Sequence, residues 1–150
     1  MSLEDDRHGE RLDDTDDVTW NLMLDLNARS VFHMARAVLP LMRAAGYGRI
    51  VNVAARAALK GQGRMGPYCA SKAAVISLTE SLAAETRDLD INVNCILPGT
   101  VDTPQNRAAM PDQDHDTWVP PEALADVMLF LASPAARCIS GAAVPVYGRS

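Results

Sequence analysis

Residues 49–72 read RIVNVAARAALKGQGRMGPYCASK, and this stretch decides the fold. Its first six residues, 49–54, form a β-branched run behind a glycine, which predicts a buried strand. Its last six begin with Pro67, and proline suits the first position of a helix because the N–H group that it lacks would have no partner there. We therefore expect a strand over 49–54, a glycine-bearing loop over 56–66 and a helix over 67–87.

The same alternation continues on both sides of this stretch. Before it, two apolar stripes predict one long helix over 17–45. Pro40 should bend or stop its last turn, and Gly46 and Gly48 should end it. After it come a strand over 91–97 closed by Pro98-Gly99, a long polar loop over 98–119, a helix over 121–132 and a strand over 142–147. Strands and helices that alternate in this way form parallel sheets with right-handed crossovers, so we expect an α/β fold.

Charge is concentrated near the N-terminus. Residues 4–17 hold eight acidic and two basic side chains, a net of −6, whereas the whole chain has a net charge of −5. Because blocks of like charge stay solvated, we expect residues 1–17 to be a flexible acidic lead-in, with an acidic partner-binding tail as the alternative. The folded domain then occupies residues 18–150.

Composition and charge exclude several classes of protein. A chain of 150 residues with 48% hydrophobic and 22% charged residues can fold around one core without disulfides or metal. Its negative net charge would repel phosphates, so we expect no nucleic-acid partner. Its apolar stretches are shorter than a membrane span and no basic start precedes one, so we expect neither a membrane segment nor a secretory signal.

Cysteine and histidine are scattered along the chain. Cys69, Cys95 and Cys138 are odd in number and far apart in sequence, which indicates neither a disulfide framework nor a zinc site. The three histidines do not cluster either, so we expect no metal. Free thiols fit a reducing compartment, so we expect a cytoplasmic protein.

The strongest chemical signal is the pair Tyr68 and Lys72. Residues four apart share a helix face, so a phenol and an ammonium should lie side by side. A free tyrosine has a pKa of roughly 10, and a neighbouring cation lowers that pKa toward the range useful for acid–base catalysis. Such a pair also occurs by chance in structural helices, so it does not assign a function alone.

With their surroundings, these residues resemble the short-chain dehydrogenase/reductase family. In that family a Tyr-x-x-x-Lys pair opens a helix after a strand of the Ile-Val-Asn type, and an asparagine lies on the preceding helix. The matching segments here are Asn27, Ile50-Val51-Asn52-Val53, Tyr68, Lys72, Asn92-Val93-Asn94 and Pro98-Gly99-Thr100-Val101-Asp102-Thr103. They run from about Trp20 to Gly148.

The resemblance implies a fold and a reaction. The fold is a three-layer Rossmann-like parallel sheet, of which this chain resembles the C-terminal half only, with about three strands and long flanking helices. No glycine-rich turn of the family's cofactor-binding half is found, so we expect binding of NAD or NADP to be incomplete. Gly61-Gln62-Gly63-Arg64-Met65-Gly66 fits a dinucleotide fingerprint, but it begins too far after its strand, and we interpret it as a loop over the substrate pocket.

The resemblance also assigns roles to residues. It implies NAD(P)-dependent hydride transfer in which Tyr68 donates the proton, Lys72 lowers its pKa and holds the nicotinamide ribose, and Asn27 keeps a water in the proton relay. The implied cofactor contacts are Tyr68, Lys72, Pro98, Gly99, Val101 and Thr103. The implied substrate loop includes Ala55, Met110 and Trp118. For Trp118, a structural role as an anchor in the core is an equal alternative.

One departure bears on the substrate, which should be a small molecule. The family places a serine thirteen residues before the tyrosine, and this position is Ala55. This variation resembles the dihydropteridine reductase branch and favours a pterin-like or other quinonoid or imine substrate, which needs a proton donor more than a clamp for a localised oxyanion. The alternatives are a carbonyl reductase of the 3-oxoacyl type with a substitute donor, and a truncated, non-catalytic dimerisation module.

The sequence also bears on how the chain assembles. The family dimerises through the helices that correspond to 17–45 and 67–87, so the resemblance implies a homodimer or tetramer. The strand over 50–54 would also present an unpaired edge rich in valine and isoleucine, which favours pairing with a partner.

Overall fold

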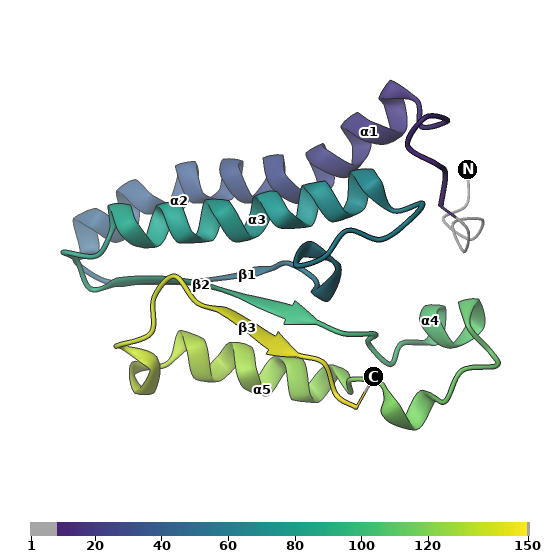
Figure 1. The fold of residues 1–150 in the computed structure, drawn as a ribbon. Coiled ribbons are helices and arrows are strands. Elements are labelled where there is room, and N and C mark those ends of the chain that lie inside the picture. The colour runs from purple at the N-terminus through teal and green to yellow at the C-terminus, as the bar shows by residue number, and fades with distance from the viewer. Residues whose placement is uncertain (1–8, 150) are drawn as a thin grey trace.

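A computed structural model describes residues 9–149 and shows a three-stranded parallel sheet between two layers of helices (Figure 1). Strands β1 (Gly48–Val53), β2 (Ile91–Pro98) and β3 (Ala143–Val146) lie in that order, so β2 is central. Helices α2 (Ser30–Ala45) and α3 (Gly66–Glu85) cover one face, and α5 (Pro121–Ala132) covers the other. The predicted α/β class, parallel pairing and three layers are confirmed.

The predicted helix over 17–45 consists of three consecutive helical segments. Helix α1 (Asp17–Leu24) starts where the Asp16 carboxylate accepts a hydrogen bond from the backbone N–H of Thr19 at 2.7 Å. A π-helical segment, Asp25–Arg29, then leads into α2 without a break. The helix does not stop at Pro40, because only one donor is lost there; it ends at Gly46, in the left-handed conformation with φ of 69°.

The core follows the central strand. Every residue of β2 from Ile91 to Leu97 is buried. One face of β2 packs against α3, where Ser71, Val75 and Thr79 recur at four-residue spacing and are each 0% exposed. The other face packs against α5, with Ile96 and Leu131 in one cluster. This packing fixes the N-terminal turn of α3 over the ends of β1 and β2.

Strand β1 is one of the two edges of the described sheet. It pairs with β2 alone, from Gly48 opposite Ile91 to Val53 opposite Ile96. A groove of about 420 Å³ lies between β1 and α2, and Met34 on α2 and Val53 on β1 are 63% and 44% exposed beside it. The edge and the apolar helix surface thus remain open in this chain.

The segment between β2 and α5 is more ordered than a polar loop. It contains α4 (Pro104–Ala109) and a 3₁₀ turn over His115–Thr117, which the sequence did not predict. The Thr103 hydroxyl begins α4 by accepting from the backbone N–H of Asn106 at 3.2 Å. A parallel bridge between Val101 and Val119 closes the base of the segment.

The predicted acidic lead-in is described only from Gly9 onward, and residues 1–8 lie outside the described residues. Its described part turns at Leu12–Asp14, and the carbonyl of Gly9 accepts a hydrogen bond from Arg64 at 2.6 Å. Among residues 9–149, no helix combines the length and the apolar character needed to cross a membrane.

Candidate functional site

Asn27, Tyr68 and Lys72 meet at the carboxyl end of β1. Asn27 lies in the π-helical segment, which is a common position for functional residues because the wider turn changes the direction of its side chains. Its amide donates hydrogen bonds to the carbonyl of Met23 and to the hydroxyl of Ser71, both at 3.0 Å. The Ser71 hydroxyl in turn donates to the carbonyl of Tyr68 at 2.8 Å. A continuous chain of hydrogen bonds therefore joins Asn27 to the turn that carries Tyr68.

Lys72 is fixed by the sheet. Its ammonium donates to the carbonyl of Val53, the last residue of β1, at 3.0 Å. The same ammonium lies 6.0 Å from the centre of the Tyr68 ring. The two side chains are thus on one side of α3, as their four-residue spacing predicts.

The electrostatics differ from the sequence prediction. Burial raises the pKa of the Tyr68 phenol above its ordinary value, and repulsion from Cys69 adds to this. Burial also lowers the pKa of the Lys72 ammonium. The prediction that Lys72 lowers the pKa of Tyr68 is therefore wrong for this structure, because the loss of hydration outweighs a cation that is 6.0 Å from the ring and is bonded to Val53. Tyr68 is a protonated phenol at neutral pH, which is the form that can donate a proton.

The turn after β2 lies at the same end of the sheet. Pro98 ends β2, and the N–H of Gly99 donates to the carbonyl of Val146 on β3 at 2.9 Å. Val101 accepts from the Asn106 amide at 2.7 Å, and Thr103 caps α4. All four residues are half-buried, so the turn is both held by the fold and accessible. In parallel α/β sheets, this end of the strands is where ligands bind.

The three residues predicted for a substrate loop differ in position. Ala55 is 8% exposed and directly follows the buried Ala54 after β1. Met110 ends α4 and is half-buried, and its carbonyl contacts the ring of His115 at 2.9 Å. Trp118 is 6% exposed and its ring centre lies 4.4 Å from that of His115, so it anchors the segment in the core.

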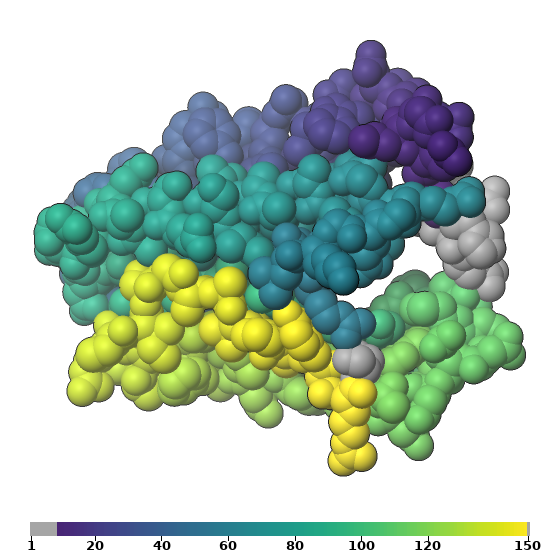
Figure 2. All heavy atoms as spheres, in the orientation of Figure 1, coloured from purple at the N-terminus to yellow at the C-terminus, as the bar shows by residue number. Residues whose placement is uncertain are grey.

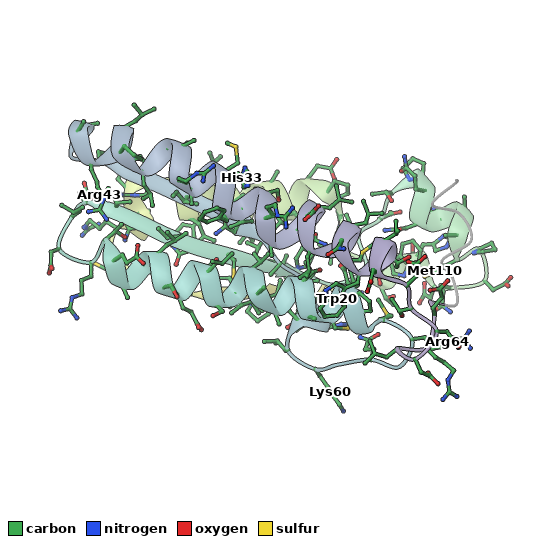
Figure 3. All side chains as sticks on the ribbon, turned by 90° about the horizontal axis from the view of Figure 1, so that it is seen from above. Trp20, His33, Arg43, Lys60, Arg64 and Met110 are labelled. Atoms are coloured by element: carbon green, nitrogen blue, oxygen red, sulfur yellow. The ribbon has the colours of Figure 1, made fainter. Side chains whose placement is uncertain are left out.

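The pictures show how this end of the molecule is arranged. Met110 and Arg64 lie at the same end, whereas Lys60 extends away from the body of the molecule (Figure 3). Figure 2 shows an opening between the loop that precedes α3 and the segment that contains α4. The groove between α2 and β1 reaches Val53, the partner of Lys72, but Tyr68 and Lys72 are not among the residues that line it.

Ser71 is a site residue that the sequence prediction missed as a functional position. The sequence does not single it out, because a serine inside a helix commonly serves close packing. Its signal was its place between Tyr68 and Lys72, one turn from the phenol, combined with an asparagine on the neighbouring helix. Spacing alone does not reveal that the two helices bring these side chains together.

Comparisons with known proteins show which family the chain belongs to. Residues 3–148 match the family model described as enoyl-(acyl carrier protein) reductase. The chain is 35% identical over 150 residues to dehydrogenase/reductase SDR family member 4 of Oryctolagus cuniculus, covering 93% of this chain and 57% of that protein. It is 34% identical over 140 residues to the 3-oxoacyl-[acyl-carrier-protein] reductase FabG of Vibrio harveyi, covering 88% of this chain and 57% of that protein.

Solved structures give the same result. Carveol dehydrogenase from Mycobacterium avium, in complex with NAD, superposes with a TM-score of 0.84 at 28% identity, over 93% of this chain and 59% of that one. These matches show that the chain belongs to the short-chain dehydrogenase/reductase family. The chain spans 57% of the length of the rabbit relative and 45% of a second relative, dehydrogenase/reductase SDR family member 6 of Danio rerio.

Proposed function

We propose that this chain carries the proton-donating part of an NAD(P)-dependent oxidoreductase, with Tyr68 as the proton donor. The observation that carries the proposal is the assembly of Asn27, Tyr68 and Lys72 from two helices at the end of β1, through Ser71 and Val53. Among residues 9–149, the Tyr68 hydroxyl has no hydrogen-bond partner, so it is available to a substrate.

The three side chains divide the work. Tyr68, kept protonated by burial, donates its proton to the substrate atom that becomes basic during reduction. Lys72 uses one of its three N–H groups on Val53 and has two left, which can hold a ribose hydroxyl and stabilise the phenolate that Tyr68 leaves. The amide oxygen of Asn27 is left to accept from a water that returns a proton.

The residues present fit a nicotinamide cofactor at this end of the sheet. Lys72, Pro98, Gly99, Val101 and Thr103 would hold it, and a bound nicotinamide would supply or accept the hydride. The fit rests on the two unused N–H groups of Lys72 and on the half-buried turn after β2. NAD in the carveol dehydrogenase structure, and NADH in that of 4-hydroxyisoleucine dehydrogenase, support a nicotinamide cofactor for this chain as well.

Position 55 bears on the substrate. The methyl group of Ala55 cannot donate a hydrogen bond to a substrate oxygen, and a lost oxyanion donor typically costs about 10²- to 10³-fold in rate. A pterin-like, quinonoid or imine substrate, in which charge is delocalised, is affected least. Reduction of a 3-oxoacyl carbonyl is the alternative, and the likeness to the Vibrio harveyi reductase favours it.

A rate measurement tests the reaction. The purified chain is mixed with NADH or NADPH and with a quinonoid dihydropterin or a 3-oxoacyl thioester, and oxidation of the nicotinamide is followed by absorbance. We expect oxidation that Tyr68→Phe slows by about 10²- to 10⁴-fold. Tyr47→Phe, at an exposed residue before β1, is the matched control and should change nothing. Absence of oxidation with every pair, or a fully active Tyr68→Phe variant, refutes the proposal.

The substrate class has its own test. Ala55→Ser should accelerate reduction of the 3-oxoacyl thioester by about 10²-fold if a hydroxyl is what the site lacks, and it should leave reduction of the dihydropterin within about threefold. If the wild-type chain reduces the 3-oxoacyl thioester faster than the dihydropterin, the carbonyl alternative is the correct one.

Self-assembly is a second function that the surface favours. Val18, Leu26, Met34 and Leu41 on the first helical layer are each more than 60% exposed. Such a run of exposed apolar side chains marks an interaction surface. We therefore propose a homodimer or tetramer that forms through α1, α2 and α3.

A further inference from the structure

A pocket of about 260 Å³ is lined by residues next to the start of β2 and before β3. This is the end of the sheet opposite to the one where α3 starts (Figure 1). Its wall is formed by side chains that the proposed reaction does not use: Arg87, Leu89, Asp90, Ile91, Asn92, Arg137, Cys138 and Ser140. The exposed Cys138 thus lines a small polar pocket together with two arginines.

The loop that carries the thiol is held firmly. The amide of Asn92 donates to the carbonyl of Arg137 at 3.1 Å, on one side of Cys138. The amide of Asn94 donates to the carbonyl of Ile139 at 2.8 Å, on the other side. The backbone of Cys138 is therefore fixed to β2, and its position beside the pocket is a property of the fold.

Asn92, another residue that lines the pocket, carries an unsatisfied acceptor. The residue is only 8% exposed, and its side-chain oxygen has no hydrogen-bond partner among residues 9–149. A buried carbonyl without a donor costs roughly 1–3 kcal/mol. A ligand with an N–H group that reached the floor of the pocket would supply the missing donor.

The charges around the thiol favour an anion, although the whole chain is negative. The carboxylate of Asp90 is already paired with Arg49 at 2.8 Å. Arg87 has only a loose contact with Asp88 at 3.9 Å, and Arg137 only a long bond to the carbonyl of Pro134 at 3.5 Å. Both guanidinium groups can therefore turn to a ligand that carries carboxylates.

We propose that Cys138 is a modification site for a small anionic disulfide that carries peptide N–H groups. The thiolate of Cys138 attacks one sulfur of the disulfide, a new S–S bond forms, the old S–S bond breaks, and the released thiolate takes up a proton. Cys138 is oxidised and half of the reagent is reduced, so no other oxidant is needed. Arg87 and Arg137 bind the carboxylates, and Asn92 accepts from a peptide N–H.

Mass spectrometry of the intact chain after exposure to oxidised glutathione, a dianionic thiol-derived peptide disulfide at neutral pH, tests the proposal. We expect one added glutathionyl group, located at Cys138 by peptide mapping, and none at the buried Cys69 and Cys95. Cys138→Ser should abolish the adduct, and the chain should release it on reduction. Modification at Cys69 or Cys95 instead, or no adduct, overturns the proposal.

The charge of the reagent separates a built site from a merely exposed thiol. The rate with oxidised glutathione is divided by the rate with cystamine, a dicationic disulfide of the same chemistry. Replacing both Arg87 and Arg137 by glutamine should lower this ratio about tenfold, whereas Arg43→Gln, on α2, should leave it unchanged. If the rate ratio of the variant that lacks Arg87 and Arg137 equals that of Arg43→Gln, the exposure of the thiol alone determines the reactivity of Cys138. Because neither measurement depends on hydride transfer, failure here is distinct from failure of the proposed reaction.

Discussion

Replacing Ser71 by alanine tests whether the link between Asn27 and Tyr68 contributes to the fold. Ser71 is 0% exposed, and the change removes two hydrogen bonds, one from the amide of Asn27 at 3.0 Å and one to the carbonyl of Tyr68 at 2.8 Å. A typical hydrogen bond contributes a net 0.5–1.5 kcal/mol, so their loss should cost about 1–3 kcal/mol. Asn27 keeps its bond to Met23, which favours the lower part of this range.

The matched control lies on the same helix. Ser77 is exposed on α3, so Ser77→Ala brings the same gain in helix propensity, up to about 0.7 kcal/mol, without breaking a buried bond. Urea unfolding followed by circular dichroism should give Ser71→Ala a free energy of unfolding at least about 1 kcal/mol below that of Ser77→Ala, with unchanged slopes. For a chain of this length the difference corresponds to about 2–4 °C in Tm.

Equal stabilities of the two variants would refute this reasoning. They would show that the hydrogen bonds of Ser71 are replaced by others at no cost, and that Asn27 and Tyr68 are held in place by packing alone. A drop in reductase rate without a drop in stability would instead indicate that the link orients Tyr68 without supporting the fold.

The absorbance of the Tyr68 phenolate can be followed against pH as the difference between the wild type and Tyr68→Phe. Since burial raises the pKa of Tyr68, the midpoint should lie above the ordinary value of about 10, and a midpoint below 10 contradicts this. Leu131→Ala should cost about 2–5 kcal/mol in urea unfolding, because Leu131 is 2% exposed, whereas Leu129→Ala at 71% exposure should stay within about 0.5 kcal/mol; similar losses would refute the assigned core. Met34→Lys, in the groove beside β1, should reduce self-association in sedimentation velocity while Leu59→Lys does not; a wild type that is monomeric at every concentration contradicts it.

The elements with strong local patterns were predicted well from the sequence. The β-branched runs at 49–54 and 91–97 became β1 and β2, within one residue at each end. Helix α5 covers the predicted range 121–132. These segments were predictable because their own apolar residues show how they are buried. Such residues recur with the period of the element or form one continuous run.

Features that depend on contacts between elements were not predictable in the same way. The π-helical turn at Asp25–Arg29 has no local signature, since its sequence also suits an α-helix. Pro40 was expected to bend or stop the last turn of the helix over 17–45, but the helix does not stop there and ends at Gly46, as the glycines predicted. The short helix α4 was missed because its start depends on the side chain of Thr103 in a segment rich in proline.

The pKa values of Tyr68 and Lys72 show the limit of spacing as a guide to chemistry. Spacing correctly placed both groups on one side of α3. It could not report that the ammonium is bonded to Val53, or that the phenol lies partly out of water. A pKa depends on hydration as much as on neighbouring charge, so its direction needs the tertiary structure.

The β1 edge of the sheet connects the proposed assembly to the proposed chemistry of the site. Lys72 takes its position from Val53, which is the last residue of β1 and is 44% exposed on this edge. Asn27 takes its position from a helical layer whose outer face carries Leu26 at 61% exposure. Local opening is easiest where few apolar contacts cover an element, so both anchors belong to the less protected part of the fold. Any partner that covers β1 or this layer should therefore hold Lys72 and Asn27 more rigidly and raise the rate of the proton transfer that we propose for Tyr68.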